Sequence, residues 1–385
     1  MKLAILATHP VQYTAPVFRE LAKFPDLSFK VFFGCDHGTQ PQEDPNFGVV
    51  FKWDCDPTAG YEHEFLSNGS VEKVKGLSGI RLAFSASQKI NDYQPDKVLI
   101  FAYSPIFITL STVFLNWSGQ TLLLRAETTD EALYRSPLKD KLRKWILSLY
   151  YQQFDFFFPI GSNSQSHYFR MGIQKEKMAI TPYSIDVDFF QKQVDNWLPQ
   201  RDVLRSNAGI EPTDLVLVYC GKMFAPKNPL LIPKALNLLS SEKKSRLWFI
   251  AVGDGELRTQ FETQMKAELG HRALFVGFKN QSELGEFYAM SDVLVFPSQS
   301  GETWGLVVNE ALQFGLRVIA SDKVGSSRDL IRTENQGYQF PSGQVEAFSR
   351  VILATIQNRL IPLKSINLPH PSDLAQAVYS QIHSR

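Results

Sequence analysis

Residues 298–315 read SQSGETWGLVVNEALQFG, and this stretch decides how the second half of the chain folds. The apolar run VLVF at 293–296 precedes it and is typical of a buried strand, which Pro297 ends. From Gly305 onward the apolar residues recur at helical spacing. The stretch therefore predicts a buried strand, a polar loop and a helix that starts near Gly305.

Two glutamates stand in this stretch, Glu302 in the loop and Glu310 on the predicted helix. Ligands of α/β sheets bind beyond the carboxyl ends of the strands, which is where this loop lies. The first N–H groups of a helix and the positive end of its dipole attract phosphate. Carboxylates instead accept hydrogen bonds from sugar hydroxyls. The pattern indicates a nucleotide-sugar site, the alternative being two solvated glutamates that bind nothing.

Apolar strands alternate with helical segments along the whole chain, which predicts an α/β fold with two doubly wound parallel sheets. A length of 385 residues suits two domains. We expect the domain boundary in the polar stretch 185–195, and irregular structure over 36–75. Strands are expected at 3–7, 29–33, 97–101, 121–125, 156–160, 215–220, 247–252, 273–276, 293–296 and 317–320.

The motif SGETWGLVVNEAL, followed by GLRVIASDKVGSSRDLI, resembles the signature of retaining GT-B glycosyltransferases of family 4, also described as glycosyl transferases group 1. The resemblance is dense over about residues 180–331 and thinner before them. It is carried in addition by YCGKMFAPKNP at 219–229, VGDG at 252–255, VGF at 276–278, SDVLVFPS at 291–298 and PYSIDVDFF at 182–190.

This resemblance implies two Rossmann-like domains that face each other across a cleft. Residues 1–187 would form an N-terminal acceptor-binding domain, and residues 188–368 a nucleotide-sugar-binding domain. Residues 369–385 would form a final helix that packs back on the first domain. A hinge between the domains is expected in the segment 183–200.

The resemblance also assigns donor contacts. Lys222 and Lys227 match the basic pair that holds the donor diphosphate; the first of the pair is usually Arg, so Lys222 keeps the charge but loses the bidentate fork. Glu302 would hold the sugar hydroxyls and Glu310 the ribose. Glu302, Lys222 and Lys227 are thus the expected catalytic residues. The remaining expected donor contacts are Gly253, Val276, Phe278, Gly305, Leu306 and Val307.

On the first-domain side of the cleft, His9 and Tyr13 follow the first predicted strand. Tyr103 and Glu127 follow two later strands, and all four are expected at the acceptor. The family often places a glycine-rich loop after the first strand, and this chain lacks those glycines.

The implied function is transfer of a hexose from a UDP- or GDP-linked donor to a hydroxyl of a carbohydrate or lipid-linked acceptor, as in polysaccharide or glycolipid synthesis. The resemblance also implies that the anomeric configuration of the sugar is retained. No metal or other cofactor is expected. Asp186-Val187-Asp188 has the form of a metal-binding triplet, but the lysines already neutralise a diphosphate. One alternative is a GT-B-like nucleotide-sugar epimerase, which needs no acceptor. The other is a non-enzymatic two-domain sugar-binding protein, which would need an export signal.

Composition excludes some classes. Forty basic and 39 acidic residues give a net charge of +1, which argues against a dedicated nucleic-acid binder. The three cysteines match no metal or disulfide pattern, which indicates a reducing, cytoplasmic location. The start MKLAILATHPVQY is better explained as a first strand than as a signal peptide. The sequence has no run of eighteen apolar residues, so no membrane-spanning helix is predicted.

A basic and aromatic segment at 135–150 allows two interpretations. Leu138, Leu142, Trp145 and Ile146 share one face of the predicted helix, with lysines around them. That face could dock on the inner face of a membrane, which would make the protein peripheral. Alternatively, the face packs on its own sheet and the lysines are solvated.

Overall fold

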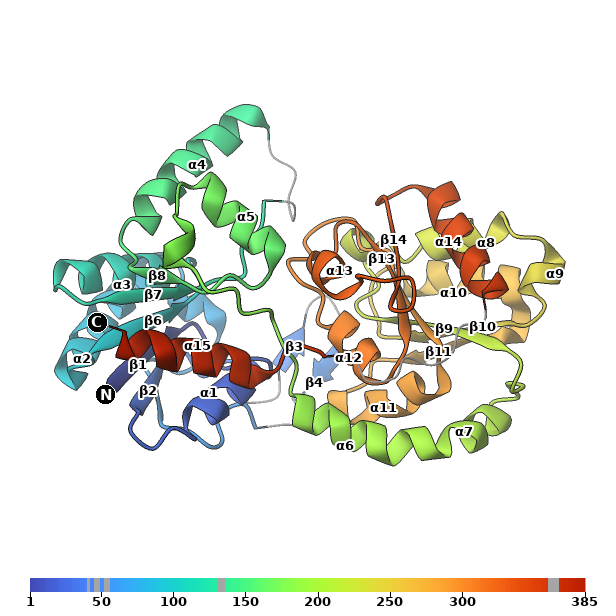
Figure 1. Ribbon diagram of the computed structural model, residues 1–385, viewed down its shortest axis with the longest axis horizontal. Coiled ribbons are helices and arrows are strands. Elements are labelled where there is room, and N and C mark those ends of the chain that lie inside the picture. Colours follow the sequence, from blue (N-terminus) through green and yellow to red (C-terminus); the bar gives the residue numbers. More distant parts are fainter. Residues whose placement is uncertain (40–41, 45–48, 52–55, 131–135, 359–366, 385) are drawn as a thin grey trace.

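The computed structural model describes residues 1–385 except 40–41, 45–48, 52–55, 131–135, 359–366 and 385. Two parallel six-stranded sheets lie side by side, each in its own domain (Figure 1). The first has the order β5 (His63–Phe65), β2 (Ser28–Phe33), β1 (Lys2–Ala7), β6 (Lys97–Phe101), β7 (Leu122–Arg125) and β8 (Phe156–Phe157). The second has the order β11 (Ala273–Gly277), β10 (Leu247–Val252), β9 (Leu215–Cys220), β12 (Val293–Phe296), β13 (Arg317–Ser321) and β14 (Gly337–Phe340). A separate antiparallel pair joins β3 (Gln42–Asp44) and β4 (Val49–Phe51).

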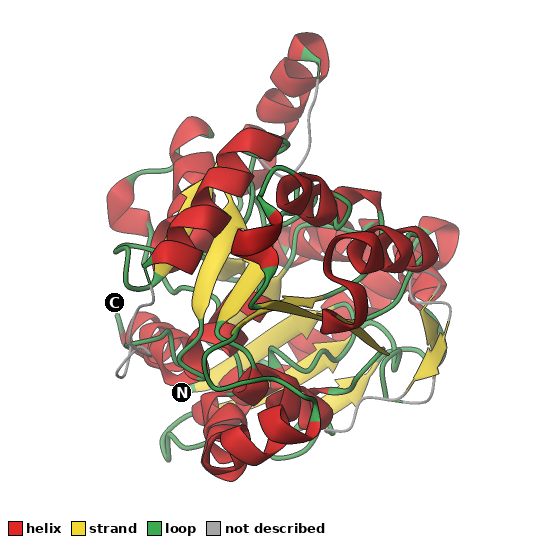
Figure 2. Ribbon diagram, turned by 90° about the vertical axis from the view of Figure 1, so that its right-hand side faces the viewer, coloured by secondary structure: helices red, strands yellow, loops and turns green. Residues whose placement is uncertain are grey.

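Helices cover both faces of each sheet, as the alternating sequence predicts. Figure 2 shows the sheets between these helical layers. The helices of the first half are α1 (Ala15–Leu21), α2 (Gly76–Tyr93), α3 (Ile106–Trp117), α4 (Pro137–Tyr151) and α5 (Ser162–Arg170). The others are α6 (Val187–Trp197), α7 (Arg201–Asn207), α8 (Leu231–Asn237), α9 (Ser241–Lys244), α10 (Arg258–Leu269), α11 (Gln281–Met290), α12 (Val307–Gln313), α13 (Gly325–Leu330), α14 (Val345–Gln357) and α15 (Pro371–His383).

Alternate residues of the first sheet enter two different cores, because successive side chains of a strand point to opposite faces. In β1, Ala4 and Leu6 join the core beneath α2, α3 and α4, while Leu3 and Ile5 join the core beneath α1 and α15. The second sheet behaves in the same way. Leu217 of β9 faces α8, α10 and α14, and Val218 faces α6, α11 and α12.

The last helix, α15, lies on the first domain although it follows the second in sequence (Figure 1). Its apolar stripe of Leu374, Val378 and Ile382 is fully buried against α1 and the first sheet. Lys97 Nζ also donates to the Gln381 carbonyl near the end of the helix, at 2.6 Å. The chain therefore crosses between the domains twice.

Helix α6 occupies most of the segment in which the hinge is expected. The predicted hinge of residues 183–200 and the polar stretch 185–195 are largely helical, because Phe190, Val194 and Trp197 recur at helical spacing and pack on the second domain's core. Asp186 caps this helix by accepting from Phe189 N at 3.1 Å and pairs with Arg19 at 2.6 Å. Asp186 is thus engaged as a cap and an ion-pair partner.

The expected strands all form, with small differences. The strand expected at 156–160 stops at Phe157, because Pro159 has no N–H and the chain turns into α5. Two short edge strands, β5 and β14, were not expected, since three or four residues give too little pattern. The helix expected from Gly305 begins at Val307 and has seven residues.

Candidate functional site

A cavity of about 360 Å³ opens where the two domains face each other. Its larger wall comes from loops at the carboxyl ends of β9, β10, β11 and β12, and its other wall from the segments after β1 and β7. The second sheet reverses its strand order between β9 and β12, which is where α/β sheets form ligand crevices. We call this space the donor cavity.

Two glycines permit close backbone approach in the donor cavity. Gly253 has φ +129, and a Cβ there would lie 2.0 Å from the Gly221 carbonyl oxygen. Gly305 has φ +91, and its Cβ would lie 2.9 Å from Val324. Both conformations are left-handed or nearly so, where side chains are strained. A side chain at Gly253 would therefore displace the backbone after β9, and one at Gly305 would press on the Val324 side chain.

A largely buried ion pair lines the donor cavity. Lys227, after β9, pairs with Glu302, after β12, and the side chains are only 18% and 12% exposed. Burial and the neighbouring Lys222 lower the pKa of Lys227 to about 8, so the amine still carries a proton at neutral pH. The site thus presents positive charge next to a carboxylate, both held by strand-end loops.

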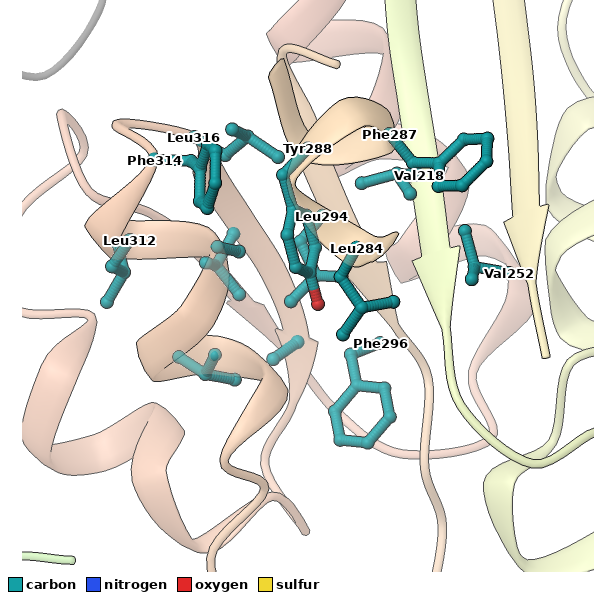
Figure 3. Packing of buried hydrophobic residues seen from close by; sticks show 14 of the residues in the cluster. Val218, Val252, Leu284, Phe287, Tyr288, Leu294, Phe296, Leu312, Phe314 and Leu316 are labelled. Carbon is teal, nitrogen blue, oxygen red and sulfur yellow. The ribbon is translucent and has the colours of Figure 1, made fainter. Parts of the chain in front are cut away.

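Glu310 lies on α12 at the cavity wall and is almost completely buried. Its Oε2 accepts a 2.8 Å hydrogen bond from the Tyr288 hydroxyl. Figure 3 shows Tyr288 within the apolar cluster, with its single polar atom at the end of the ring. Burial raises the pKa of Glu310 to about 7, although the Tyr288 bond acts in the opposite direction. Glu310 is therefore a buried acid that a hydroxyl-bearing ligand can reach.

The start of α12 supplies backbone groups to the cavity. Gly305, Leu306 and Val307 all line it. The first amides of a helix have no intrahelical acceptor and point along the axis. With seven residues, α12 has a small dipole, so the lysines supply most of the positive charge.

A second cavity of about 330 Å³ lies at the carboxyl edge of the first sheet, and we call it the acceptor cavity. It sits where the strand order reverses between β1 and β6. His9 lines it and stands edge-to-face with His37, with ring centroids 5.4 Å apart. Burial, and then His37, lower the pKa of His9 to about 4, so its ring is neutral. Tyr103 and Ser104 line the same space.

Glu127 and Tyr183 line both cavities and so form their common wall. Burial, with the neighbouring Glu127 carboxyl second, raises the pKa of Tyr183 well above its usual value. Beneath them, the buried Arg125 donates to the carbonyl oxygens of Phe158 and Pro159 at 3.1 and 3.3 Å. Arg125 thus holds the backbone around this wall, and Glu127 is the carboxyl group of the wall.

Most of the predicted residues meet in one place. The donor cavity brings together Tyr13, Glu127, Lys222, Lys227, Gly253, Phe278, Glu302, Gly305, Leu306, Val307 and Glu310. His9 and Tyr103 lie in the acceptor cavity. Val276 does not line either cavity, because its side chain packs against the apolar core.

Sequence reasoning missed Gln12, Tyr183 and Trp304, which line the donor cavity. Among the described residues, Gln12 Oε1 has no hydrogen-bond partner although it is buried. Trp304 Nε1 donates to Asn309 at 2.9 Å, and Asn309 donates to the Tyr183 carbonyl at 3.1 Å. Trp304 stands in the quoted motif SGETWGLVVNEAL between Glu302 and Gly305, so its position beside those residues is a signal that could have found it.

Within the described ranges, no group of three or more His, Cys, Asp or Glu is arranged to hold a metal ion. The same part of the chain contains no helix long and apolar enough to cross a membrane. Cys35 and Cys220 are free thiols, and Cys55 lies outside the described residues.

Comparison with known proteins adds a family match. Residues 200–372 match the family Glycosyl transferases group 1. The sulfoquinovosyl transferase SQD2 of Arabidopsis thaliana is 34% identical over 139 residues, covering 35% of this chain and 25% of that protein. A Campylobacter jejuni N-acetylgalactosaminyltransferase acting on an undecaprenol-linked glycan is 26% identical over 220 residues, covering 57% of this chain and 54% of that protein. The match thus spans about half or less of the length of these relatives.

Solved structures resemble the whole chain. HepE of Anabaena, in complex with UDP, has a TM-score of 0.67 at 17% identity and covers 99% of this chain and 95% of its own. The lipopolysaccharide galactosyltransferase WaaB has a TM-score of 0.69 at 16% identity and covers 99% of this chain and 100% of its own. At such identities the similarity establishes the two-domain GT-B fold alone.

Proposed function

We propose that this chain, whose second domain belongs to the family Glycosyl transferases group 1 and whose fold is GT-B, transfers a sugar from a nucleoside diphosphate to an acceptor hydroxyl. The observation that carries the proposal is the donor cavity itself. It places two lysines, two glutamates and the start of a helix at adjoining strand ends. Diphosphate, sugar and ribose are the three chemical groups that such a set recognises together.

The roles follow from the chemistry of each group. Lys222 and Lys227 bind the diphosphate, with the amides near Leu306. Glu302 accepts from the sugar hydroxyls, and Glu310 accepts from the ribose. UDP is bound by the structural neighbour HepE, which supports a uridine or other nucleoside diphosphate as the leaving group. The acceptor, a carbohydrate or lipid-linked hydroxyl, enters through the acceptor cavity.

Transfer proceeds with retention of configuration in this proposal. The bond from the anomeric carbon to the β-phosphate oxygen breaks, and the acceptor oxygen bonds to the same face of that carbon. The acceptor proton passes to the departing phosphate oxygen. Lys222 and Lys227 stabilise the charge that develops there, the role usually given to preorganised cations. No metal is required for this step, so activity should survive an excess of chelator.

The Lys227–Glu302 ion pair adds one feature to this scheme. In the structure the two side chains neutralise each other. Donor binding exchanges that pair for a lysine–phosphate contact and a glutamate–hydroxyl contact. Glu302 therefore competes with the diphosphate for Lys227 until a sugar is present to engage the carboxylate.

A thermal-shift screen tests the proposal directly. Nucleoside diphosphates and their sugars should raise the melting temperature, because a ligand that binds only the native state stabilises it by mass action. UDP or GDP should act, and the corresponding monophosphate should act less. A subsequent transfer assay, with the anomeric configuration of the product read by NMR, separates transfer from epimerisation. Turnover of donor without acceptor would favour the epimerase.

A further inference from the structure

Exposed apolar side chains are concentrated on one part of the first domain. Of the fifteen large hydrophobic residues that are exposed among those described, ten belong to α2, α3 and α4. We call these ten the α2–α4 surface. They are Leu77, Ile80, Phe84, Ile106, Trp117, Leu138, Leu142, Trp145, Ile146 and Leu149.

Helix α4 is apolar on both of its sides. Leu147, Tyr150 and Tyr151 pack into the core, and the Tyr150 hydroxyl lies 2.8 Å from that of Thr112 on α3. The opposite side carries Leu138 and Trp145, which are 79% and 63% exposed. A solvated helix normally has a polar outer face. The structure therefore rejects packing on the sheet as the explanation of this apolar stripe.

The three helices present their outer sides in the same direction. All of them cover the same face of the first sheet, so their outer sides turn away from that sheet together. Phe84 of α2 stands 6.1 Å from Phe114 of α3, which in turn stands 6.0 Å from Trp117. Helix α4 projects above the rest of the domain (Figure 1). The exposed apolar side chains thus form one group on α2 and α3 and a second group on the projecting α4.

The charges beside the stripe are positive. Lys139 lies on one side of it and Lys141 and Lys144 on the other, at about 100° of helix rotation per residue, and all three are exposed. Asp140 is the single acidic residue of α4. A second copy of this chain would bring these lysines against one another. An anionic bilayer instead attracts them while its interior accepts the apolar side chains.

We propose that the α2–α4 surface docks on a membrane that contains anionic lipids, and that the protein takes a lipid-linked acceptor from it. The identity of the acceptor rests on the proposed transferase function; the docking does not. Each of the three helices follows the carboxyl end of a strand, so their first turns lie at the cleft edge. Ile106 begins α3 two residues after Ser104, which lines the acceptor cavity. A bilayer on this surface would thus border the acceptor entrance.

Vesicle flotation with the full chain tests the docking without any donor. Wild-type protein should float with phosphatidylglycerol-containing vesicles and much less with phosphatidylcholine alone, and added salt should release it. The double change Leu142→Ser and Trp145→Ser should lower binding about tenfold or more, because two inserted apolar groups are lost. Each of Lys139→Gln, Lys141→Gln and Lys144→Gln should lower it about fivefold.

A matched control uses apolar residues that are equally exposed on the second domain. Val203→Ser and Leu238→Ser, which are 62% and 54% exposed in the wild type, should leave flotation unchanged. Equal loss in the control and the Leu142/Trp145 variant would overturn the proposal, as would a wild type that ignores anionic vesicles or forms a dimer through this face. Calorimetry with UDP separates the two hypotheses: UDP binding without vesicle binding sinks the docking alone. Vesicle binding without binding of any nucleoside diphosphate sinks the transferase alone.

Discussion

The two halves of the cleft are built in different ways. The donor half draws Glu302, Gly305 and Glu310 from nine consecutive positions, and its two lysines from one loop. The acceptor half draws His9, Tyr103 and Glu127 from three strand ends far apart in sequence. Functional residues that lie close together in the sequence form one motif, so they can be recognised from the sequence alone. An assembled surface becomes visible only when the sheet brings its strand ends together.

This contrast predicts that the two halves of the cleft have separate effects on activity, which experiments can test. Changes in the donor half should alter nucleotide binding or the chemical step. Changes in the acceptor half should alter transfer while nucleotide binding is preserved.

The largest effect is expected for Glu302→Gln. Transfer should fall by about 3 kcal/mol in activation free energy, roughly a hundredfold or more, since a charged contact to the reacting sugar is lost. UDP should bind more tightly, because Lys227 loses its competing partner. Steady-state kinetics and calorimetry measure the two quantities. The matched control is Glu262→Gln, which breaks the Lys266 pair on α10 and should change neither.

Glu310→Gln should change how stability depends on pH. The pKa of Glu310 in the folded protein is raised to about 7 from 4.5, so its folded form keeps a proton that the unfolded chain releases. The stabilisation of the folded protein by this proton is complete below the pKa of Glu310 in the unfolded chain. It is lost as the pH rises through the pKa of Glu310 in the folded protein. Gln does not titrate and has no such loss. The free energy of unfolding of the variant, relative to that of the wild type, should therefore rise by about 3 kcal/mol between about pH 4.5 and pH 7.5. Denaturant unfolding at the two pH values checks this.

A stability difference between Glu310→Gln and wild type that is the same at both pH values would show that Glu310 titrates normally. UDP affinity of the wild type should also weaken as pH falls below 7, because a protonated carboxyl is a poorer acceptor for the ribose hydroxyls. The Gln variant should bind UDP more weakly and with less pH dependence.

How far the sequence alone leads can be judged at particular residues. The ten expected strands follow from periodicity, because buried parallel strands are continuous apolar runs, and the GT-B fold follows from the resemblance of the quoted motifs to a known family. Helix α6 was missed because Asp186, Asp188 and the polar residues after them interrupt the apolar pattern as a linker would, although the apolar face of the helix is buried. Tyr183 was missed for another reason: its place in both cavity walls depends on two domains coming together. No local pattern encodes that arrangement.

Lys227→Ala should weaken UDP binding by about 2 kcal/mol, roughly thirtyfold, because a partly desolvated charge-assisted contact is removed. Lys222→Ala should act in the same direction with a similar or milder loss. Calorimetry of each variant gives the affinity, and Lys234→Ala on the exposed side of α8 is the control. Unchanged affinity in both cavity variants would place the diphosphate elsewhere.

Glu127→Gln should have the smallest effect and is the sharpest test of the division between the halves. Its carboxylate lines both cavities beside Tyr183, so we expect it to accept from an incoming acceptor hydroxyl rather than to bind the nucleotide. Transfer should fall about tenfold, close to 1.4 kcal/mol, while UDP affinity stays at the wild-type value. Glu72→Gln, which removes an exposed ion pair with Lys75 in the same domain, should change neither quantity. If UDP affinity falls together with the transfer rate in the Glu127 variant, then Glu127 contacts the donor, and only Tyr103 and His9 remain as expected acceptor contacts.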